Sequence, residues 1–179
     1  MILTQWRGKK LHSGPVVELI ARRIIDIHKA FVNRRIKDLS RRDQMTQVFS
    51  DNRYCFVCGE KNPFGLKLKI RMDEAMGEAE TDVTFAEHFQ GWKEIVHGGL
   101  LAAVLDEVMI YAAKTKGFMC VTGEMTVRYV KPPRTGTPMK FRAWIVEDKG
   151  RILMAESEVL DSEGNHIGRA SGKLFKMKD

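Results

Sequence analysis

Two short groups of residues in the middle of the sequence have types and spacing that could do chemistry. His97-Gly98-Gly99 precedes an apolar run, and Asp106-Glu107 lies inside it. The first N–H groups of a helix have no intrahelical acceptor and lie at the positive end of its dipole. Two glycines at a helix entrance would leave these groups open to a carbonyl oxygen that becomes negative during attack, or to a phosphate. The glycines could instead serve close packing alone.

Asp106 is the candidate reacting group. It stands among Val104, Leu105 and Val108, and a carboxylate in an apolar helix is costly to bury unless it is paired or takes part in chemistry. The other reading puts Asp106 on the solvent edge of the helix. His97 and Asp106 are nine positions apart, so they face opposite sides of a helix, about 13 Å apart along its axis. A site that uses both predicts an obligatory twofold dimer, with one residue from each chain.

The elements that must position these residues follow from the periodicity of apolar residues. A wide apolar face predicts a helix from Gly98 to about Lys116. Alternation predicts strands at 65–73 and 77–85 before the helix, and at 119–131, 139–147, 151–160 and 166–177 after it. Short connections between such strands require antiparallel neighbours. The sequence therefore predicts an α+β fold, an antiparallel sheet of about six strands wrapped around a central helix.

The charge distribution divides the 179 residues into two parts. Residues 1–50 contain 11 lysines and arginines against 4 aspartates and glutamates, which accounts for the whole net charge of +7. Apolar residues at helical spacing predict a basic amphipathic helix over 15–39. We expect residues 1–50 to be a basic helical N-terminal extension and residues 51–179 to be the main domain. Packing of the helix on the same protein is favoured over lipid, nucleic acid or a targeting role.

Several classes of protein are not expected. The longest uncharged apolar stretch, Ile95 to Leu105, is shorter than the roughly 20 residues of a membrane-spanning helix. There is no secretory signal pattern, and three cysteines do not make a disulfide framework. A structural zinc site needs four ligands, and Cys55-x-x-Cys58 is joined by no second such pair and no close histidine pair. We expect a cytoplasmic protein without membrane, metal or cofactor.

A set of motifs in fixed order resembles the hotdog-fold acyl-CoA thioesterases, in the branch near the phenylacetate-degradation type. These motifs are Cys55-Phe56-Val57-Cys58-Gly59, Asn62-Pro63-Phe64-Gly65-Leu66, Gly91-Trp92, Val96-His97-Gly98-Gly99, Leu105-Asp106-Glu107-Val108-Met109 and Arg128-Tyr129-Val130-Lys131-Pro132. The resemblance covers residues 55–177 and implies the hotdog fold, hydrolysis of an acyl-CoA thioester and a homodimer or homotetramer.

The resemblance also implies roles for single residues. Asp106 matches the carboxylate that activates water or attacks the carbonyl, and the Gly99 N–H would polarise that carbonyl. His97 would orient the substrate or the helix entrance, and Thr122 matches a residue that helps to hold the attacking water. Glu107 competes with Asp106, because related branches place a glutamate on this helix.

Further substrate contacts are expected at Gly98 and Glu107, and at Lys131 and Arg134. The last two stand beside the Pro132-Pro133 turn, where they could bind the phosphates of CoA or be solvated.

Two other functions compete with hydrolysis. One is a hotdog protein that senses acyl-CoA without cleaving it and contacts DNA through its basic segment. Asp106 on the helix and the lack of a second helix after a short turn count against it, so no nucleic acid partner is expected. The other is a dehydratase or hydratase on the same fold, which uses a different arrangement of histidine and aspartate.

Overall fold

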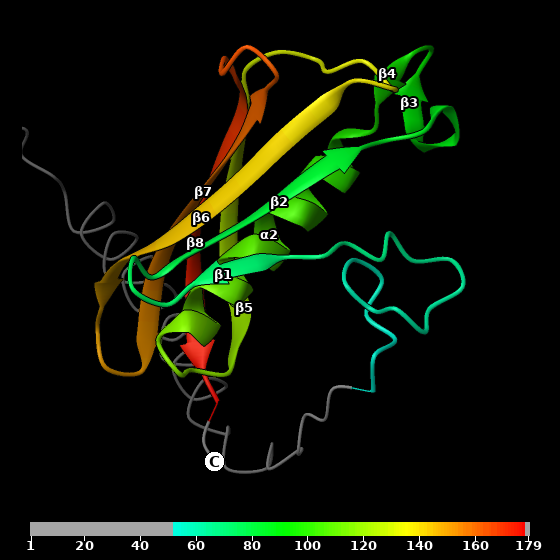
Figure 1. Cartoon of the computed structure of the whole chain (residues 1–179). Coiled ribbons are helices and arrows are strands. Elements are labelled where there is room, and N and C mark those ends of the chain that lie inside the picture. The colour runs from blue at the N-terminus through cyan, green and yellow to red at the C-terminus, as the bar shows by residue number, and fades with distance from the viewer. Residues whose placement is uncertain (1–51, 178–179) are drawn as a thin grey trace, which may run out of the picture. The chain divides into compact units, whose positions relative to one another are not determined.

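The computed structural model describes residues 52–177, in which a six-stranded sheet surrounds one long helix (Figure 1). The helix is α2 (Gly98–Thr115). The strands, in their order across the sheet, are β1 (Arg71–Asp73), β2 (Glu78–Thr84), β6 (Pro138–Asp148), β7 (Ile152–Asp161), β8 (His166–Lys176) and β5 (Cys120–Tyr129). All neighbouring strands are antiparallel. The predicted fold class is confirmed.

The apolar face of α2 forms the centre of the core, and Figure 1 shows the sheet curving around this helix. Seven of its residues are buried: Leu101, Val104, Leu105, Val108, Met109, Ala112 and Ala113. They pack with sheet residues such as Phe141, Leu153 and Leu174, which are also fully buried. Burying each large apolar side chain contributes about 1.5–3 kcal/mol, so this contact fixes where the polar residues of α2 must face.

The first predicted strand is much shorter than expected. Only Arg71–Asp73 of the interval 65–73 pairs in the sheet, as β1. The N–H groups of Leu66 and Leu68 donate instead to the carbonyls of Phe56 and Val57, at 2.7 and 2.9 Å. Lys67 between them has φ +53°, a left-handed conformation that interrupts an extended strand.

A short hairpin precedes α2. It consists of a 3₁₀ turn, η2 (Glu87–Phe89), and the strands β3 (Gln90–Trp92) and β4 (Ile95–Val96), which form a separate two-stranded sheet. The alternation of apolar residues predicts no strand between residue 85 and the helix. The strands of three and two residues are too short for period-2 alternation to be visible.

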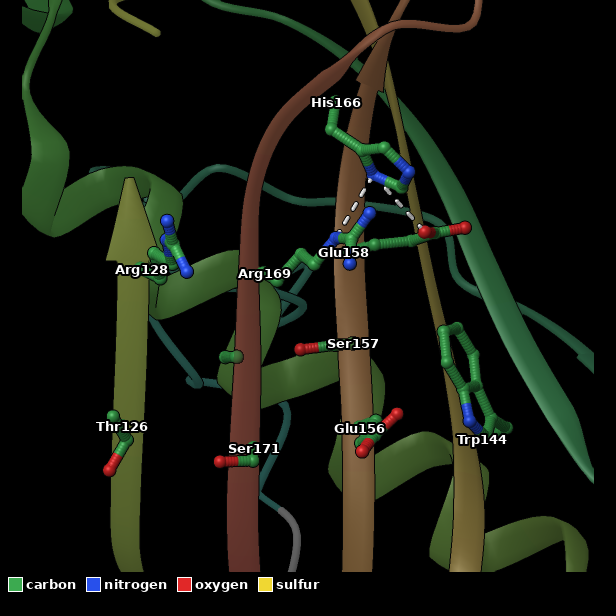
Figure 2. A pocket seen from close by; sticks show the side chains of 10 residues that line it. Thr126, Arg128, Trp144, Glu156, Ser157, Glu158, His166, Arg169 and Ser171 are labelled. Carbon is green, nitrogen blue, oxygen red and sulfur yellow. Dashed lines mark hydrogen bonds and ion pairs between the residues drawn. The ribbon is translucent and has the colours of Figure 1, made fainter. Parts of the chain in front are cut away.

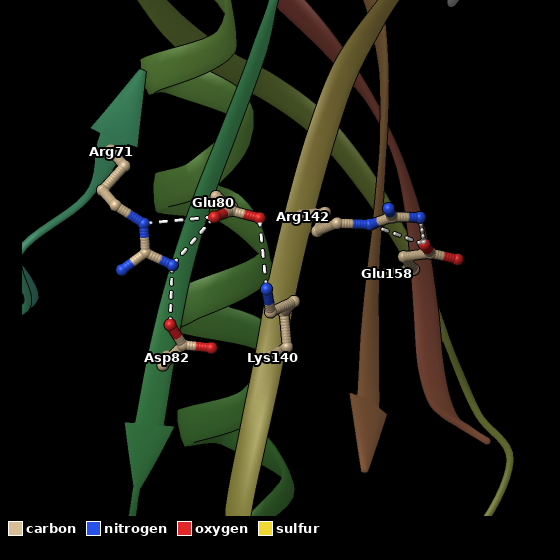
Figure 3. A network of polar contacts seen from close by, with 6 residues as sticks. All are labelled: Arg71, Glu80, Asp82, Lys140, Arg142 and Glu158. Atoms are coloured by element: carbon tan, nitrogen blue, oxygen red, sulfur yellow. Dashed lines mark hydrogen bonds and ion pairs between the residues drawn. The ribbon is translucent and has the colours of Figure 1, made fainter. Parts of the chain in front are cut away.

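The outer face of the sheet carries a network of ion pairs instead of a second core. Figure 3 shows its six residues, Arg71, Glu80, Asp82, Lys140, Arg142 and Glu158. The hydrogen bond from Arg71 holds the pKa of the Glu80 carboxyl below its usual range. The pairs of Arg71 and Lys140 are largely exposed and contribute little stability each, whereas Glu158, which pairs with Arg142, is buried. Together they show that this face of β1, β2, β6 and β7 is polar.

The predicted N-terminal extension, with its helix over 15–39, lies outside the described residues. Within residues 52–177, no helix combines the length and the apolar character needed to cross a membrane.

Candidate functional site

Asp106 and Thr122 meet between α2 and β5. The Thr122 hydroxyl donates to Asp106 Oδ1 at 2.6 Å, and the pair is partly buried. Asp106 follows buried Leu105 on α2 and is itself half-buried. A short hydrogen bond to a carboxylate is among the stronger kinds. The two residues that the resemblance names for the attacking water are thus in direct contact.

A β-bulge at Gly123 aims Thr122 at the helix. The pairing of β5 with β8 shifts register between Thr122 and Glu124. Thr122 before the bulge and Met125 after it are both half-buried, although regular alternation would turn one of them outward. A Cβ atom on Gly123 would lie 2.1 Å from the ring of Phe175, so any larger residue at the bulge would require that ring to move.

Hydrogen bonds within the N-cap, to the preceding 3₁₀ turn and to β5 fix the start of α2. His97 is the N-cap, and its Nδ1 accepts the N–H of Gly99 at 3.0 Å. The N–H of His97 donates to Phe89 O at 3.0 Å, and the hydroxyl of Tyr129 donates to Gly98 O at 2.9 Å. The predicted oxyanion donor, the Gly99 N–H, is therefore capped by His97, while His97 and Gly99 both face solvent.

The helix entrance and Asp106 are separate places within one chain. α2 runs unbroken from Gly98 to Thr115, so the nine positions between His97 and Asp106 correspond to about 13 Å along the axis and half a turn in direction. The structure brings Asp106 and Thr122 together, and it brings His97, Gly98 and Gly99 together.

Lys131 and Arg134 are already engaged by carboxylates of the same chain. Lys131 forms an ion pair with Asp161, and its hydrogen bond holds the pKa of that carboxyl well below the usual range. Arg134 Nη1 lies 2.7 Å from Glu94 Oε2. The turn that carries them lies close to the helix entrance, since the Val96 N–H donates to the carbonyl of the residue before Arg134 at 3.0 Å.

Glu107 lies beside the two cysteines that precede the sheet. The Cys55 thiol is 3.6 Å from Glu107 Oε2, and ligand atoms of Cys55, Cys58 and Glu107 all lie within 4.8 Å of one another. Burial, and then Glu107, raises the pKa of the Cys58 thiol to about 12. Among the described residues, this cluster could hold a metal ion. The sequence does not reveal this cluster, because Glu107 follows Cys58 by 49 positions.

The described part of the chain has at least two hollows. One of about 400 Å³ opens on the outer face of the sheet (Figure 2), among the outward side chains of β5 to β8. In it His166 Nδ1 lies 3.4 Å from both Glu158 and Arg169. None of the predicted site residues lines this hollow. A second, of about 430 Å³, is lined in part by Cys58 and Tyr111.

Comparison with known proteins gives a consistent family likeness. Residues 93–167 match the thioesterase superfamily, and no curated protein matches the sequence. The PaaI protein of the Escherichia coli phenylacetic acid degradation operon is 20% identical, with a TM-score of 0.59 over 63% of this chain and 81% of that chain. A thioesterase superfamily protein of known structure is 19% identical, with a TM-score of 0.65 over 96% of this chain and 82% of that chain.

A hypothetical thioesterase from Streptococcus pneumoniae was solved with coenzyme A. It is 16% identical, with a TM-score of 0.58 over 63% of this chain and 90% of that chain. The same protein was also solved with one aspartate and, separately, one threonine changed to alanine, and these two residues lie 16 positions apart. The predicted resemblance to hotdog-fold thioesterases near the phenylacetate-degradation type is confirmed.

Proposed function

We propose that this chain, a hotdog-fold relative of the thioesterase superfamily, hydrolyses an acyl-CoA thioester, with Asp106 as its catalytic carboxylate. The observation that carries the proposal is the 2.6 Å hydrogen bond from Thr122 to Asp106. It holds a half-buried carboxylate in one orientation on a rigid, apolar helix. The 16 positions between Asp106 and Thr122 equal the spacing of the two residues changed in the Streptococcus pneumoniae protein, which supports assigning them a joint role.

The reaction needs one carboxylate and one water. Asp106 takes a proton from water as the water oxygen attacks the thioester carbon, or attacks that carbon itself and is released by water afterwards. In both routes a C–O bond forms, the C–S bond breaks, and the products are a carboxylate, the CoA thiol and a proton. Thr122 occupies Oδ1, which leaves Oδ2 for the water or the carbonyl carbon.

The negative charge that develops on the carbonyl oxygen requires donors, and the Gly99 N–H at the start of α2 is the proposed one. This N–H is bound to His97 Nδ1. Substrate binding would therefore exchange the acceptor, from His97 Nδ1 to the thioester oxygen. His97 would cap the start of α2 before the substrate binds, and its side chain would then turn toward the substrate.

The distance along α2 supports a site that is shared between two chains. About 13 Å and half a turn separate Asp106 from His97, so one thioester cannot reach both within a chain. In the described residues, β5 pairs on one side only, with β8. Such an edge is open to a second strand, and β5 carries Thr122. A homodimer, or a tetramer of two such dimers, would complete the site.

The nucleotide part of CoA would lie near the helix entrance. Lys131 and Arg134 would bind its phosphates by giving up Asp161 and Glu94, and Gly98 would allow close approach of the substrate. Glu107 faces the cysteines, and a direct contact with substrate would require it to turn away from them.

A free-thiol release assay over short, long and aromatic acyl-CoAs tests the proposal. We expect release from at least one of them with kcat/KM of about 10⁴ M⁻¹s⁻¹ or more. Binding of acyl-CoA without release, measured by calorimetry on the same preparation, would overturn hydrolysis. It would favour the acyl-CoA sensor, whose further mark would be salt-sensitive binding of duplex DNA.

A further inference from the structure

Cys55, Cys58 and Glu107 form a cluster of three metal-binding side chains separate from the Asp106–Thr122 pair. All three are half-buried, and their ligand atoms lie within 4.8 Å of one another. We propose that this cluster binds one zinc ion, with Cys55, Cys58 and Glu107 as three of its ligands. The proposal does not rest on the proposed hydrolysis of acyl-CoA.

The distances fit a zinc site that closes slightly around the ion. Bonds of about 2.3 Å to sulfur and about 2.0–2.2 Å to a carboxylate oxygen place tetrahedral ligand atoms about 3.5–3.8 Å apart. The Cys55 Sγ to Glu107 Oε2 distance is 3.6 Å. Two ligand atoms that are as much as 4.8 Å apart would have to approach each other by about 1 Å. Rotation of one cysteine about its χ1 bond can bring its sulfur that much closer.

The segment that carries the cysteines is already folded around Cys55. The Val57 N–H donates to Cys55 Sγ at 3.3 Å, and the Gly59 N–H donates to Cys55 O at 2.9 Å. These two hydrogen bonds hold the Cys55 sulfur in place beside Glu107, 3.6 Å from its Oε2. A Cβ on Gly59 would lie 2.4 Å from the Cys55 nitrogen, so this tight turn requires glycine.

The ligand types select zinc over the common hard cations. Two thiolates and one carboxylate suit zinc, whereas magnesium and calcium require oxygen ligands throughout. Three protein ligands leave a fourth position, as zinc sites open to water do. The hollow of about 430 Å³ beside Cys58 and Tyr111 gives the ion a path of entry. It also leaves space for a water molecule, which would be the fourth ligand of the tetrahedron.

This inference revises the expectation, from sequence, that no metal is bound. That expectation counted only cysteine pairs and histidines as ligands. The fold supplies Glu107 from α2 instead, on the residue next to Asp106. A zinc ion would therefore tie the segment around Cys55 and Cys58 to the helix that carries the proposed catalytic carboxylate.

Metal analysis of the full-length, tag-free protein purified without chelator tests the proposal. We expect about one zinc per chain by mass spectrometry. After exchange, Co²⁺ should show the visible bands of a tetrahedral site and sulfur-to-cobalt charge transfer.

Substitutions in the cluster should each weaken zinc affinity at least about 100-fold in chelator competition. The variants are Cys55→Ser, Cys58→Ser and Glu107→Gln. Two matched controls outside the cluster, Cys120→Ser and Glu124→Gln, should keep wild-type affinity, and circular dichroism would check that every variant is folded.

Three results would overturn the proposal. One is a wild-type protein that, fully reduced, gives no cobalt thiolate spectrum, a result that does not depend on whether any variant folds. Another is unchanged zinc affinity in Glu107→Gln. The last is a Cys55–Cys58 disulfide, two mass units lighter, in protein that takes up no metal after reduction.

Discussion

At the residue scale, the proposed activity depends on how Thr122 holds Asp106. A carboxylate on a helix has two oxygens that can exchange places, and the 2.6 Å bond from Thr122 fixes which one remains for the water. Catalysis is sensitive to such placement, since a displacement of about 1 Å can cost about 100-fold in rate. We therefore propose that Thr122 is a positioning residue, whose contribution to the rate can be measured.

Replacing Thr122 by Val should lower kcat by about 10- to 100-fold, because the shape is kept and the hydroxyl is lost. Thr122→Ser, which keeps the hydroxyl, should stay within a few-fold of the wild type. The measurement is steady-state thiol release with each variant, with KM for acyl-CoA changing little. Equal losses in both variants would indicate that packing of the Thr122 methyl group, and not its hydrogen bond, matters.

The single residues differ in how far the sequence predicts them. Asp106 and Thr122 were identified by the resemblance, and their contact could follow only from the fold. The bond between the Gly99 N–H and His97 Nδ1 was not foreseen, because a histidine at an N-cap can turn either way. The proximity of Glu107 to Cys55 depends on the path of the segment before the sheet, which periodicity does not determine.

At the element scale, the bulge in β5 is the feature on which the site depends. Regular pairing of β5 with β8 would turn Thr122 or Met125 away from α2. The extra residue, Gly123, lets both lie on the helix side, and Phe175 of the paired strand covers it. The positions of the strands after α2 could be predicted from alternation and turn residues, but the bulge could not.

A methyl group added at Gly123 should therefore strain the bulge. Gly123→Ala places a Cβ 2.1 Å from the Phe175 ring and should cost about 1–3 kcal/mol in the free energy of unfolding. For a chain of this size, each kcal/mol lowers Tm by about 2–4 °C. Thermal unfolding of Gly123→Ala measures this, and Phe175→Leu in the same chain should restore part of the loss. An unchanged Tm in Gly123→Ala would contradict the account of the bulge.

At the scale of the whole molecule, a complete site would take the helix entrance from one chain and the Asp106–Thr122 pair from its neighbour. Two inactive variants should then complement each other. Asp106→Asn removes the carboxylate, and Gly99→Pro removes the proposed oxyanion N–H at a position near a helix start that tolerates proline.

In a mixture with random exchange, about half the dimers are mixed, and each has one intact site of two. Thiol release should therefore recover to about a quarter of wild-type activity. As a matched control, Asp106→Asn mixed with Thr122→Val should gain nothing, because both changes fall in the same half of the site. Exchanged, folded mixtures without recovery would place the whole reaction within one chain.

The most direct test of the central claim is thioester hydrolysis by Asp106→Asn, measured together with binding. The substitution keeps volume and hydrogen bonding to Thr122 but removes charge and basicity. We expect kcat to fall at least about 100-fold, with the Kd for a non-cleavable thioether analogue within a few-fold of wild type. The control Asp82→Asn, on the outer face, should be as active as wild type. Full activity of folded Asp106→Asn, with Glu107→Gln inactive, would contradict the account and transfer the catalytic role to Glu107.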